Sequence, residues 1–294
     1  MHKLTGVVTA VVSPMFPDGC LDVYSFRSFI EWQVLSGING LTVAGTTGEV
    51  STLSYEEHIS LVKTTIDQTK GRVPIVVGSG SNSTFEAIHL TQAIKELGAD
   101  YSLQVVPYYN KPTQEGLYKH FKRIAEAVDL NIILYSVSSR TGVGLTADTI
   151  HRLSQIPGIV GIKETSANML TIYKLLRTKR LLKDKFAVYS GDDSTCLGAS
   201  EIGSNGVISV ISNLIPKSIV NLYNLSYRLS TKDKLNYICS KVFKLCNLMF
   251  IETNPIPVKT ILGKPGLITS GVRLPLTHLN YNHCIKVLKA IRTL

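Results

Sequence analysis

The chain has 294 residues, 44% of them apolar and 18% charged, so it can bury a large core and is not a disordered polypeptide. Its net charge of +10 is spaced along amphipathic stretches such as 174–185 and 232–244, so we expect no nucleic-acid partner. No apolar run approaches the roughly 18 to 20 residues of a membrane span, and no signal-peptide pattern is visible. We therefore expect a cytoplasmic protein without membrane contact.

Cysteine and histidine usage predicts neither disulfides nor a metal site. The five cysteines are an odd number without a CxxC pair, which is typical of reduced thiols. The seven histidines are scattered, with no HExxH motif and no cluster at ligand spacing. The cysteines are Cys20, Cys196, Cys239, Cys246 and Cys284.

Eight short apolar runs rich in β-branched residues follow one another, with stretches of helical periodicity between them. The runs alternate little between apolar and polar residues, as strands covered on both faces do. Eight such units predict an α/β fold, a (β/α)8 TIM barrel. The expected strands are 6–12, 40–44, 73–78, 101–106, 131–137, 159–163, 186–190 and 206–211, and the expected helices are 22–35, 55–69, 84–97, 114–128, 147–155 and 169–181.

Four of these helices are preceded by residues that favour an N-cap, namely Ser54, Ser83, Thr113 and Thr146. An open doubly wound sheet is the alternative fold, but residues 11–18 after the first run lack its glycine-rich phosphate loop.

After the eighth unit the pattern changes to helices alone. They are expected at 217–228, 232–250, 257–262 and 277–294. We therefore predict a catalytic barrel over residues 1–229 and a C-terminal helical domain over residues 230–294.

In a barrel of this type the functional site lies at the C-terminal ends of the strands. The second run ends in GTTGE at 45–49, where Thr46 and Thr47 offer adjacent hydroxyls and N–H groups to a carboxylate. A plain turn is equally compatible with this motif. The seventh and eighth runs can border the same pocket through backbone groups, at Gly191 and Ile208.

The fourth and fifth runs end close to Tyr109, Tyr135 and Arg140. Tyrosine hydroxyls can pass protons, and a guanidinium can hold a carboxylate through two hydrogen bonds. Each tyrosine taken alone is also compatible with a core or interface position.

The sixth run contains Lys163, and a lysine is rarely buried without a reason. Side chains alternate on a strand, so Lys163 and Glu164 point to opposite faces and cannot form a direct pair. Desolvation inside a barrel favours the neutral amine, which is the form that attacks a ketone. The alternative is a lysine that extends its amine into solvent from the strand end.

Seven motifs resemble one family, 4-hydroxy-tetrahydrodipicolinate synthase, also called dihydrodipicolinate synthase. Their order and approximate spacing agree along nearly the whole chain. The motifs are GTTGE at 45–49, PYYNKPTQEG at 107–116, YSVSSRTG at 135–142, GIKET at 161–165, SGDD at 190–193, GVISV at 206–210 and NPIPVK at 254–259.

The resemblance implies a lyase of lysine biosynthesis that uses no cofactor beyond a covalent imine between Lys163 and pyruvate. It implies that Thr46, Tyr109 and Tyr135 relay protons. Thr47 and the backbone at Ile208 would hold the pyruvate carboxylate. Arg140 would receive the second substrate, L-aspartate 4-semialdehyde.

The resemblance also implies a homo-oligomer, usually a tetramer built as a dimer of dimers, because Tyr109 would reach into the neighbouring subunit's site. Family members inhibited by L-lysine have an effector pocket at the dimer interface. Val50 and Tyr55 depart from the residues common near that pocket, so we expect weakened inhibition. The expected effector positions are Tyr55, where these enzymes commonly have histidine, and the five residues that match, Ser51, His58, Asn82, Glu86 and Tyr108.

Another departure is the sequence after Tyr135, where Ser136 and Ser138 replace the usual Asn and Pro, so the loop that aims Arg140 is expected to be less rigid. The nearest rival function is another pyruvate aldolase of the superfamily, an N-acetylneuraminate lyase or a 2-keto-3-deoxy sugar acid aldolase. Arg140 favours an amino-acid carboxylate over a neutral sugar chain. A ligand-sensing barrel without catalysis is the rival from another class, and it is disfavoured because Lys163, Tyr135 and Tyr109 are all present.

Overall fold

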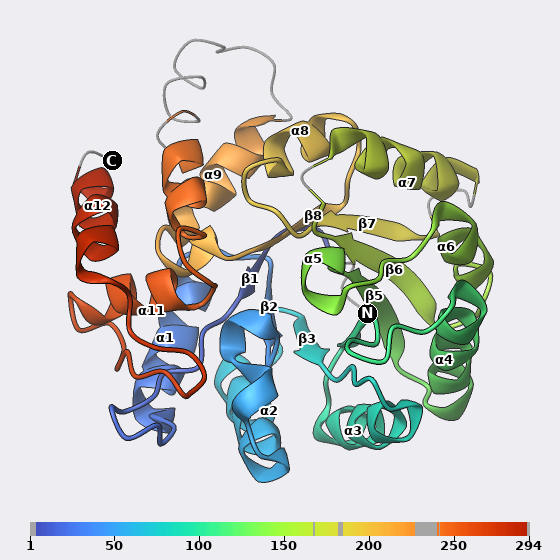
Figure 1. Cartoon of the computed structure of the whole chain (residues 1–294), viewed down its shortest axis with the longest axis horizontal. Coiled ribbons are helices and arrows are strands. Elements are labelled where there is room, and N and C mark those ends of the chain that lie inside the picture. The colour runs from blue at the N-terminus through green and yellow to red at the C-terminus, as the bar shows by residue number, and fades with distance from the viewer. Residues whose placement is uncertain (1–3, 167, 182–184, 227–239, 241, 293–294) are drawn as a thin grey trace. The chain divides into compact units, whose positions relative to one another are not determined.

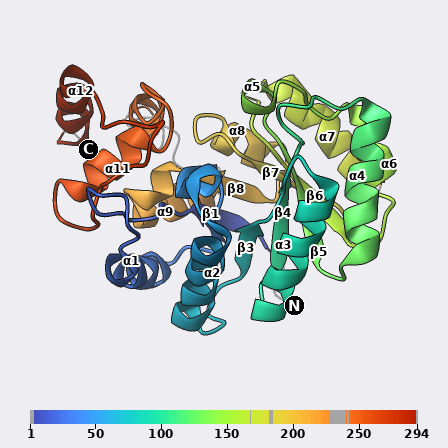
Figure 2. The same ribbon diagram turned by 60° about the horizontal axis from the view of Figure 1, so that its bottom comes forward.

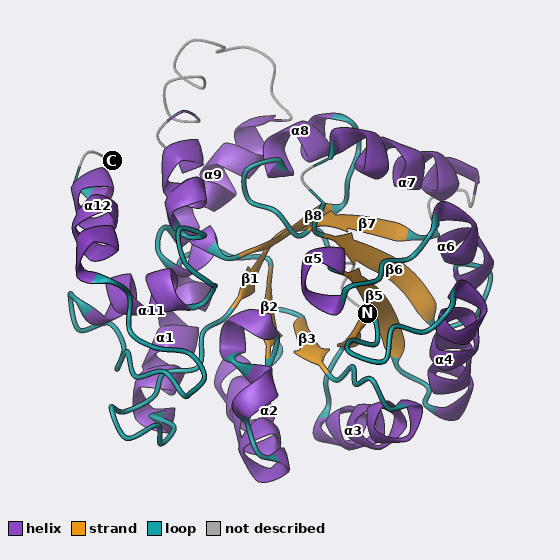
Figure 3. Cartoon of the chain, viewed as in Figure 1, coloured by secondary structure: helices purple, strands orange, loops and turns teal. Residues whose placement is uncertain are grey.

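The computed structural model describes residues 4–166, 168–181, 185–226, 240 and 242–292. Its strands follow chain order in a closed parallel barrel, so the predicted (β/α)8 fold is confirmed. Figure 3 separates the strands from the helices by colour. The strands are β1 Gly6–Ala10, β2 Gly40–Val43, β3 Ile75–Gly78, β4 Tyr101–Val105, β5 Asn131–Ser136, β6 Ile159–Glu164, β7 Ala187–Ser190 and β8 Gly206–Ser209.

The helices have the following bounds: α1 Val23–Leu35, α2 Tyr55–Thr69, α3 Thr84–Leu97, α4 Gln114–Ala127, α5 Ser138–Thr141, α6 Ala147–Leu153, α7 Met169–Leu181, α8 Cys196–Glu201, α9 Pro216–Ser226, α11 Ile256–Gly263 and α12 Tyr281–Ile291. Three 3-10 turns accompany them: η1 Thr46–Gly48, η2 Val50–Thr52 and η3 Ile211–Asn213. The described residues form two compact units, one of Leu4 with Pro74–Ile208 and one of Thr5–Val73 with the described part of the segment from Ser209 onward.

The first unit contains the strands from β3 to β7 and all of β8 except Ser209. Its helices α3, α4, α6 and α7 lie along the outer side of β4 to β7 (Figure 1 and Figure 2). Apolar side chains from both layers form one core, in which Phe121, Leu134 and Phe186 are almost completely buried. Burial on both faces explains why these strands read as nearly continuous apolar runs.

The second unit joins β1 and β2 to α1, α2 and the C-terminal helices. Gln33 of α1 is buried and joins two elements, since it accepts from the Thr9 hydroxyl at 2.9 Å and donates to the Ser212 carbonyl at 3.1 Å. Asn213 of η3 donates to the carbonyl of Ala10 at 2.8 Å. The C-terminal segment is thereby fastened to the first strand.

All four predicted N-caps are confirmed. The hydroxyl of Ser54 accepts from the Glu57 N–H, and the Glu57 carboxylate accepts from the Ser54 N–H, which completes a capping box on α2. Ser83, Thr113 and Thr146 each accept a backbone N–H in the first turn of α3, α4 and α6. Local hydrogen bonding therefore sets the start of these helices as the sequence predicts.

The predicted elements and the observed ones differ mainly at short helices and at the C-terminal end. α5 and α8 have no counterpart among the expected elements, and the last helix begins at Tyr281 instead of residue 277. Of the expected helix 232–250, residues 242–248 are helical, whereas 232–239 and 241 lie outside the described residues. The proposed domain boundary at 229/230 falls in the same undescribed part and stays a prediction.

The expectations about membrane spans, metal sites and disulfides can be compared with the described residues. No helix within the described ranges is long and apolar enough to span a bilayer. The described residues also contain no group of three or more His, Cys, Asp or Glu side chains arranged for a metal ion. Cys20, Cys196, Cys246 and Cys284 form no disulfide among the described residues, and Cys239 lies outside them.

Candidate active site

Lys163 and Tyr135 lie side by side near the C-terminal ends of β6 and β5. The two residues are partners in the parallel register, so their side chains project from the same face of the sheet. The Lys163 Nζ lies 4.5 Å from the centroid of the Tyr135 ring. Both side chains are buried, with exposed fractions of 7% for Lys163 and 6% for Tyr135. The structure thus brings the predicted nucleophile and a predicted proton-transfer residue together.

Gly191, at the end of β7, makes room for the Lys163 side chain. A Cβ at this position would lie 2.8 Å from the Lys163 Cε and 2.5 Å from the Thr165 Cγ2. The Gly191 N–H donates to the Glu164 carbonyl at 2.7 Å, which holds the two strand ends together. A glycine is therefore required here by close approach.

The amine of Lys163 has no carboxylate partner among the described residues. It lies instead over the π face of Tyr135. No described carboxylate therefore holds this amine in a salt bridge, an arrangement compatible with attack on a carbonyl carbon.

Glu164 projects from the opposite face of β6, as the alternation of side chains predicts. Burial raises the pKa of its carboxyl, while hydrogen bonds from the Ser166 backbone and the Ser136 side chain act in the opposite direction. The Thr165 hydroxyl also donates to the Ser136 carbonyl at 2.9 Å. Ser136, one of the departures from the family pattern, thus helps to join the ends of β5 and β6.

Arg140 is exposed on the short helix α5, directly after β5. Its N–H donates to the Val137 carbonyl at 2.8 Å. The Thr141 hydroxyl bonds the carbonyls of Val137 at 3.1 Å and Val143 at 2.6 Å. These bonds hold the turn that the absence of proline is expected to loosen.

Tyr109 projects almost fully into solvent, with 90% of its side chain exposed. Its backbone has a φ of 72°, in the left-handed region that a tyrosine rarely adopts. Asn82 donates to the Tyr108 carbonyl at 3.1 Å, and Asn110 donates to the Asn82 carbonyl at 2.9 Å. These side chains fix the turn so that Tyr109 projects away from its own chain.

The GTTGE loop lies in the second unit, where it forms η1. Thr47 is buried with an exposed fraction of 3%, whereas Thr46 is half-buried. The Asn254 amide donates to the Thr47 hydroxyl at 3.0 Å. Glu49, at a φ of 56°, forms an ion pair with Lys259 of α11, and both side chains are excluded from solvent. These contacts come from the segment after the barrel strands.

Asn254 and Lys259 are not among the predicted site residues. They occur in the NPIPVK motif, which the resemblance includes without giving it a role. A lysine within the apolar stretch of α11 is the signal that identifies this position, by the same reasoning that selects Lys163.

The remaining predicted residues are divided between the two units. Ile208 is completely buried in β8. Asn82 contacts Tyr108, as described above, and both belong to the first unit, as does the exposed Glu86. Ser51 and Tyr55 of the second unit are exposed, whereas His58 is buried and burial lowers its pKa to about 4.

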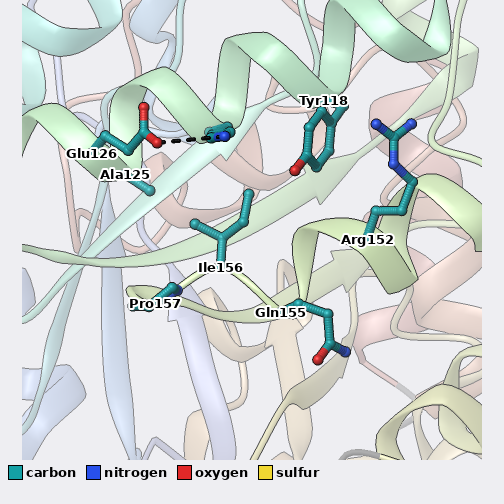
Figure 4. A pocket seen from close by; sticks show the side chains of 8 residues that line it. Tyr118, Ala125, Glu126, Arg152, Gln155, Ile156 and Pro157 are labelled. Carbon is teal, nitrogen blue, oxygen red and sulfur yellow. Dashed lines mark ion pairs between the residues drawn. The ribbon is translucent and has the colours of Figure 1, made fainter.

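A separate hollow of about 380 Å³ lies between α4 and the segment after α6 (Figure 4). Its charged side chains already have partners: Lys122 lies 3.7 Å from Glu126, and Arg152 pairs with Glu115 at 2.9 Å. The Arg152 guanidinium also stacks over the Tyr118 ring at 3.9 Å. None of the predicted site residues lines this hollow, and the candidate site stays at the strand ends.

Comparisons with known proteins identify the family of the chain. The model of the dihydrodipicolinate synthetase family matches residues 3–294. A 4-hydroxy-tetrahydrodipicolinate synthase from Herminiimonas arsenicoxydans is 45% identical over 276 residues, which cover 94% of this chain and 93% of the relative. One from Nitrosomonas eutropha is 46% identical over 288 residues, 97% of each chain.

Solved structures give the same result at the level of the fold. The chloride-inhibited dihydrodipicolinate synthase of Acinetobacter baumannii, complexed with pyruvate, superposes with a TM-score of 0.94 at 44% identity and covers 99% of this chain and 98% of its own. The enzyme of Cyanidioschyzon merolae, with lysine bound, superposes with a TM-score of 0.93 at 36% identity. The match covers 99% of this chain and 98% of that enzyme's chain.

Proposed function

The chain belongs to the dihydrodipicolinate synthetase family, and from this premise we propose that it condenses pyruvate with L-aspartate 4-semialdehyde through an imine at Lys163. The product is 4-hydroxy-tetrahydrodipicolinate, in the diaminopimelate route to lysine. The observation that supports this reaction best is the buried Lys163 amine, without a carboxylate partner among the described residues, beside Tyr135. We propose that the protein acts in the cytoplasm, where its substrates pyruvate and L-aspartate 4-semialdehyde are expected.

The reaction begins when the neutral amine of Lys163 attacks the keto carbon of pyruvate. The carbinolamine loses water, with its leaving oxygen protonated through the Tyr135 hydroxyl, and an imine forms. Loss of a proton from the pyruvate methyl group gives an enamine, whose carbon attacks the aldehyde carbon of the second substrate. The substrate amine then attacks the imine carbon, closes the ring and releases Lys163.

The other predicted residues have the following roles in this proposal. Thr47 and the backbone at Ile208 hold the pyruvate carboxylate, and Gly191 leaves space for the Lys163 side chain and its adduct. Thr46 and Tyr109 complete the proton relay with Tyr135. Arg140 binds the carboxylate of L-aspartate 4-semialdehyde through its planar guanidinium.

We further propose a homo-oligomer, a tetramer built as a dimer of dimers, because Tyr109 points away from its own chain. Its exposed fraction of 90% and its left-handed backbone support a role in the site of a neighbouring subunit. L-Lysine is proposed as an effector that binds weakly, because Val50 and Tyr55 replace the side chains common near the effector pocket. The lysine-bound relative supports such a ligand for the family.

Reductive trapping tests the central step. The protein is incubated with pyruvate, reduced with borohydride and digested, and the modified peptide is located by mass. We expect one adduct per chain, at Lys163. Turnover is then compared between L-aspartate 4-semialdehyde and N-acetylneuraminate, and only the former is expected to react. An adduct elsewhere, or preference for the sugar acid, would overturn the proposal.

A further inference from the structure

The loop that carries Thr47 is held by side chains that arrive from far along the chain. Asn254 donates to the Thr47 hydroxyl at 3.0 Å across 207 residues of sequence. Thr47 is 3% exposed and Asn254 5% exposed, so the contact is sheltered from water. A sheltered hydrogen bond of this kind fixes the orientation of both groups.

A second set of contacts fixes the backbone of the same loop. Glu49 follows η1 directly and adopts the left-handed region, which a residue with a Cβ adopts only when its surroundings hold it there. The Lys259 amine binds one oxygen of the Glu49 carboxylate, and the N–H of Arg273 donates to the other at 3.3 Å. The Arg273 guanidinium also donates to the Thr52 carbonyl at 2.7 Å and pairs with Glu57.

The direction of the bond between Asn254 and Thr47 has a chemical consequence. A threonine hydroxyl has one proton to donate and lone pairs that accept. The amide N–H of Asn254 engages a lone pair of the Thr47 oxygen. The hydroxyl proton is then directed elsewhere and is available to an anionic acceptor, and the donated bond polarises the O–H group toward that acceptor.

We propose that Asn254 is a positioning residue for pyruvate recognition, which sets Thr47 as an obligatory donor to the substrate carboxylate. Lys259 and Arg273 hold the loop backbone in the matching conformation. Asn254, Lys259 and Arg273 are thereby the residues of the C-terminal segment that contribute to substrate binding. This inference rests on the proposed function, since it takes pyruvate as the ligand of Thr47.

Asn254→Asp and Asn254→Ala test the direction of the bond. A carboxylate at 254 accepts the Thr47 proton and repels the substrate anion, so we expect the half-saturating pyruvate concentration to rise by about 100-fold, against about 10-fold for Ala. The kcat at saturating pyruvate should change much less. The matched control is Thr269→Val, which removes another bond from the C-terminal segment, to Asp22 at 2.9 Å, and should leave pyruvate saturation unchanged.

Two measurements separate positioning from general damage to the fold. In each variant, borohydride trapping by pyruvate is compared with trapping by hydroxyacetone, which lacks the carboxylate, and the ratio does not depend on the folded fraction. Relative to the wild type, the ratio should fall in Asn254→Asp and Asn254→Ala and stay unchanged in the control Thr269→Val. In a Thr47→Val background, adding Asn254→Ala should have no further effect, because the hydroxyl that Asn254 orients is gone.

The outcomes are distinguishable. If the wild-type chain is not trapped at Lys163 by pyruvate, the proposed function fails. If it is trapped but the ratio is unchanged in Asn254→Asp, or if the Ala substitution has its full effect in the Thr47→Val background, Asn254 does not act through Thr47 and the inference is overturned.

Discussion

Two buried lysines of this protein occupy opposite kinds of environment. Lys163, on a strand of the first unit, lies against an aromatic face and forms no ion pair with a described residue. Lys259, on α11 of the second unit, has no exposed surface and is bound to the Glu49 carboxylate. Burial lowers the pKa of Lys259, and the charge of Glu49 opposes that change.

The comparison shows that burial alone does not identify a nucleophile. Both lysines interrupt apolar segments, and both would be selected from the sequence by that criterion. Their contacts differ: the amine of Lys259 is bound to a carboxylate, whereas the amine of Lys163 lies over the Tyr135 ring without an ion pair to a described residue. This difference supports the proposed covalent role of Lys163 and a loop-holding role of Lys259.

The largest expected effect comes from exchanging each lysine for methionine, which keeps the length of the side chain without its amine. Lys163→Met should abolish pyruvate trapping and lower turnover by at least about 10⁴-fold, because the proposed imine forms on the amine of this residue. Lys259→Met should still give the adduct at Lys163 when pyruvate saturates. Trapping followed by peptide mass measures both. A persistent adduct in Lys163→Met would contradict the assignment of roles.

A smaller effect, on stability, is expected from breaking the ion pair between Glu49 and Lys259. Glu49→Ala leaves the Lys259 charge buried without its partner, and we expect the free energy of unfolding to fall by about 3–5 kcal/mol. Urea denaturation followed by circular dichroism measures it. The control is the double variant Glu49→Leu with Lys259→Met, which removes both charges and should lose much less. Equal losses in the two variants would show that the pair is not the source of the effect.

The fold and part of the site follow from local sequence. Ser54 and Thr113 predict the start of their helices because an N-cap bonds a backbone group only two or three residues away. Lys163 can be recognised from the sequence because it is a charged residue at the end of a short apolar run. The four residues of α5 are too few to show helical periodicity, so that helix could not be predicted.

The contacts that hold the Thr47 loop could not be predicted for a different reason. Glu49 and Lys259 are 210 residues apart, and Thr47 and Asn254 are 207 apart. No local pattern links positions so distant, since their contact depends on how the C-terminal segment packs. The side chain of Lys259 is recognisable as unusual from the sequence, but its partner is visible only in the structure.

The smallest expected effect concerns a buried histidine, which can be compared with the two buried lysines. His120 of α4 is buried, its Nδ1 lies 2.8 Å from the Thr84 hydroxyl, and burial lowers its pKa from 6.5 to about 4. The unfolded chain therefore binds a proton at a higher pH than the folded protein. Stability contributed by the neutral ring is complete above pH 6.5, falls between pH 6.5 and about 4, and is constant below that.

The size of this pH effect follows from the same two values. The difference between 6.5 and about 4 corresponds to about 3 kcal/mol for His120. His120→Gln keeps a polar group near Thr84 and removes the proton-binding site, so its unfolding free energy should decline less than that of the wild type between pH 7 and pH 4. His58, whose pKa burial also lowers to about 4, remains in both proteins and contributes equally. Parallel stability curves for the two proteins would show that His120 is not a buried neutral base, and the contrast between paired and unpaired bases would then hold for the lysines alone.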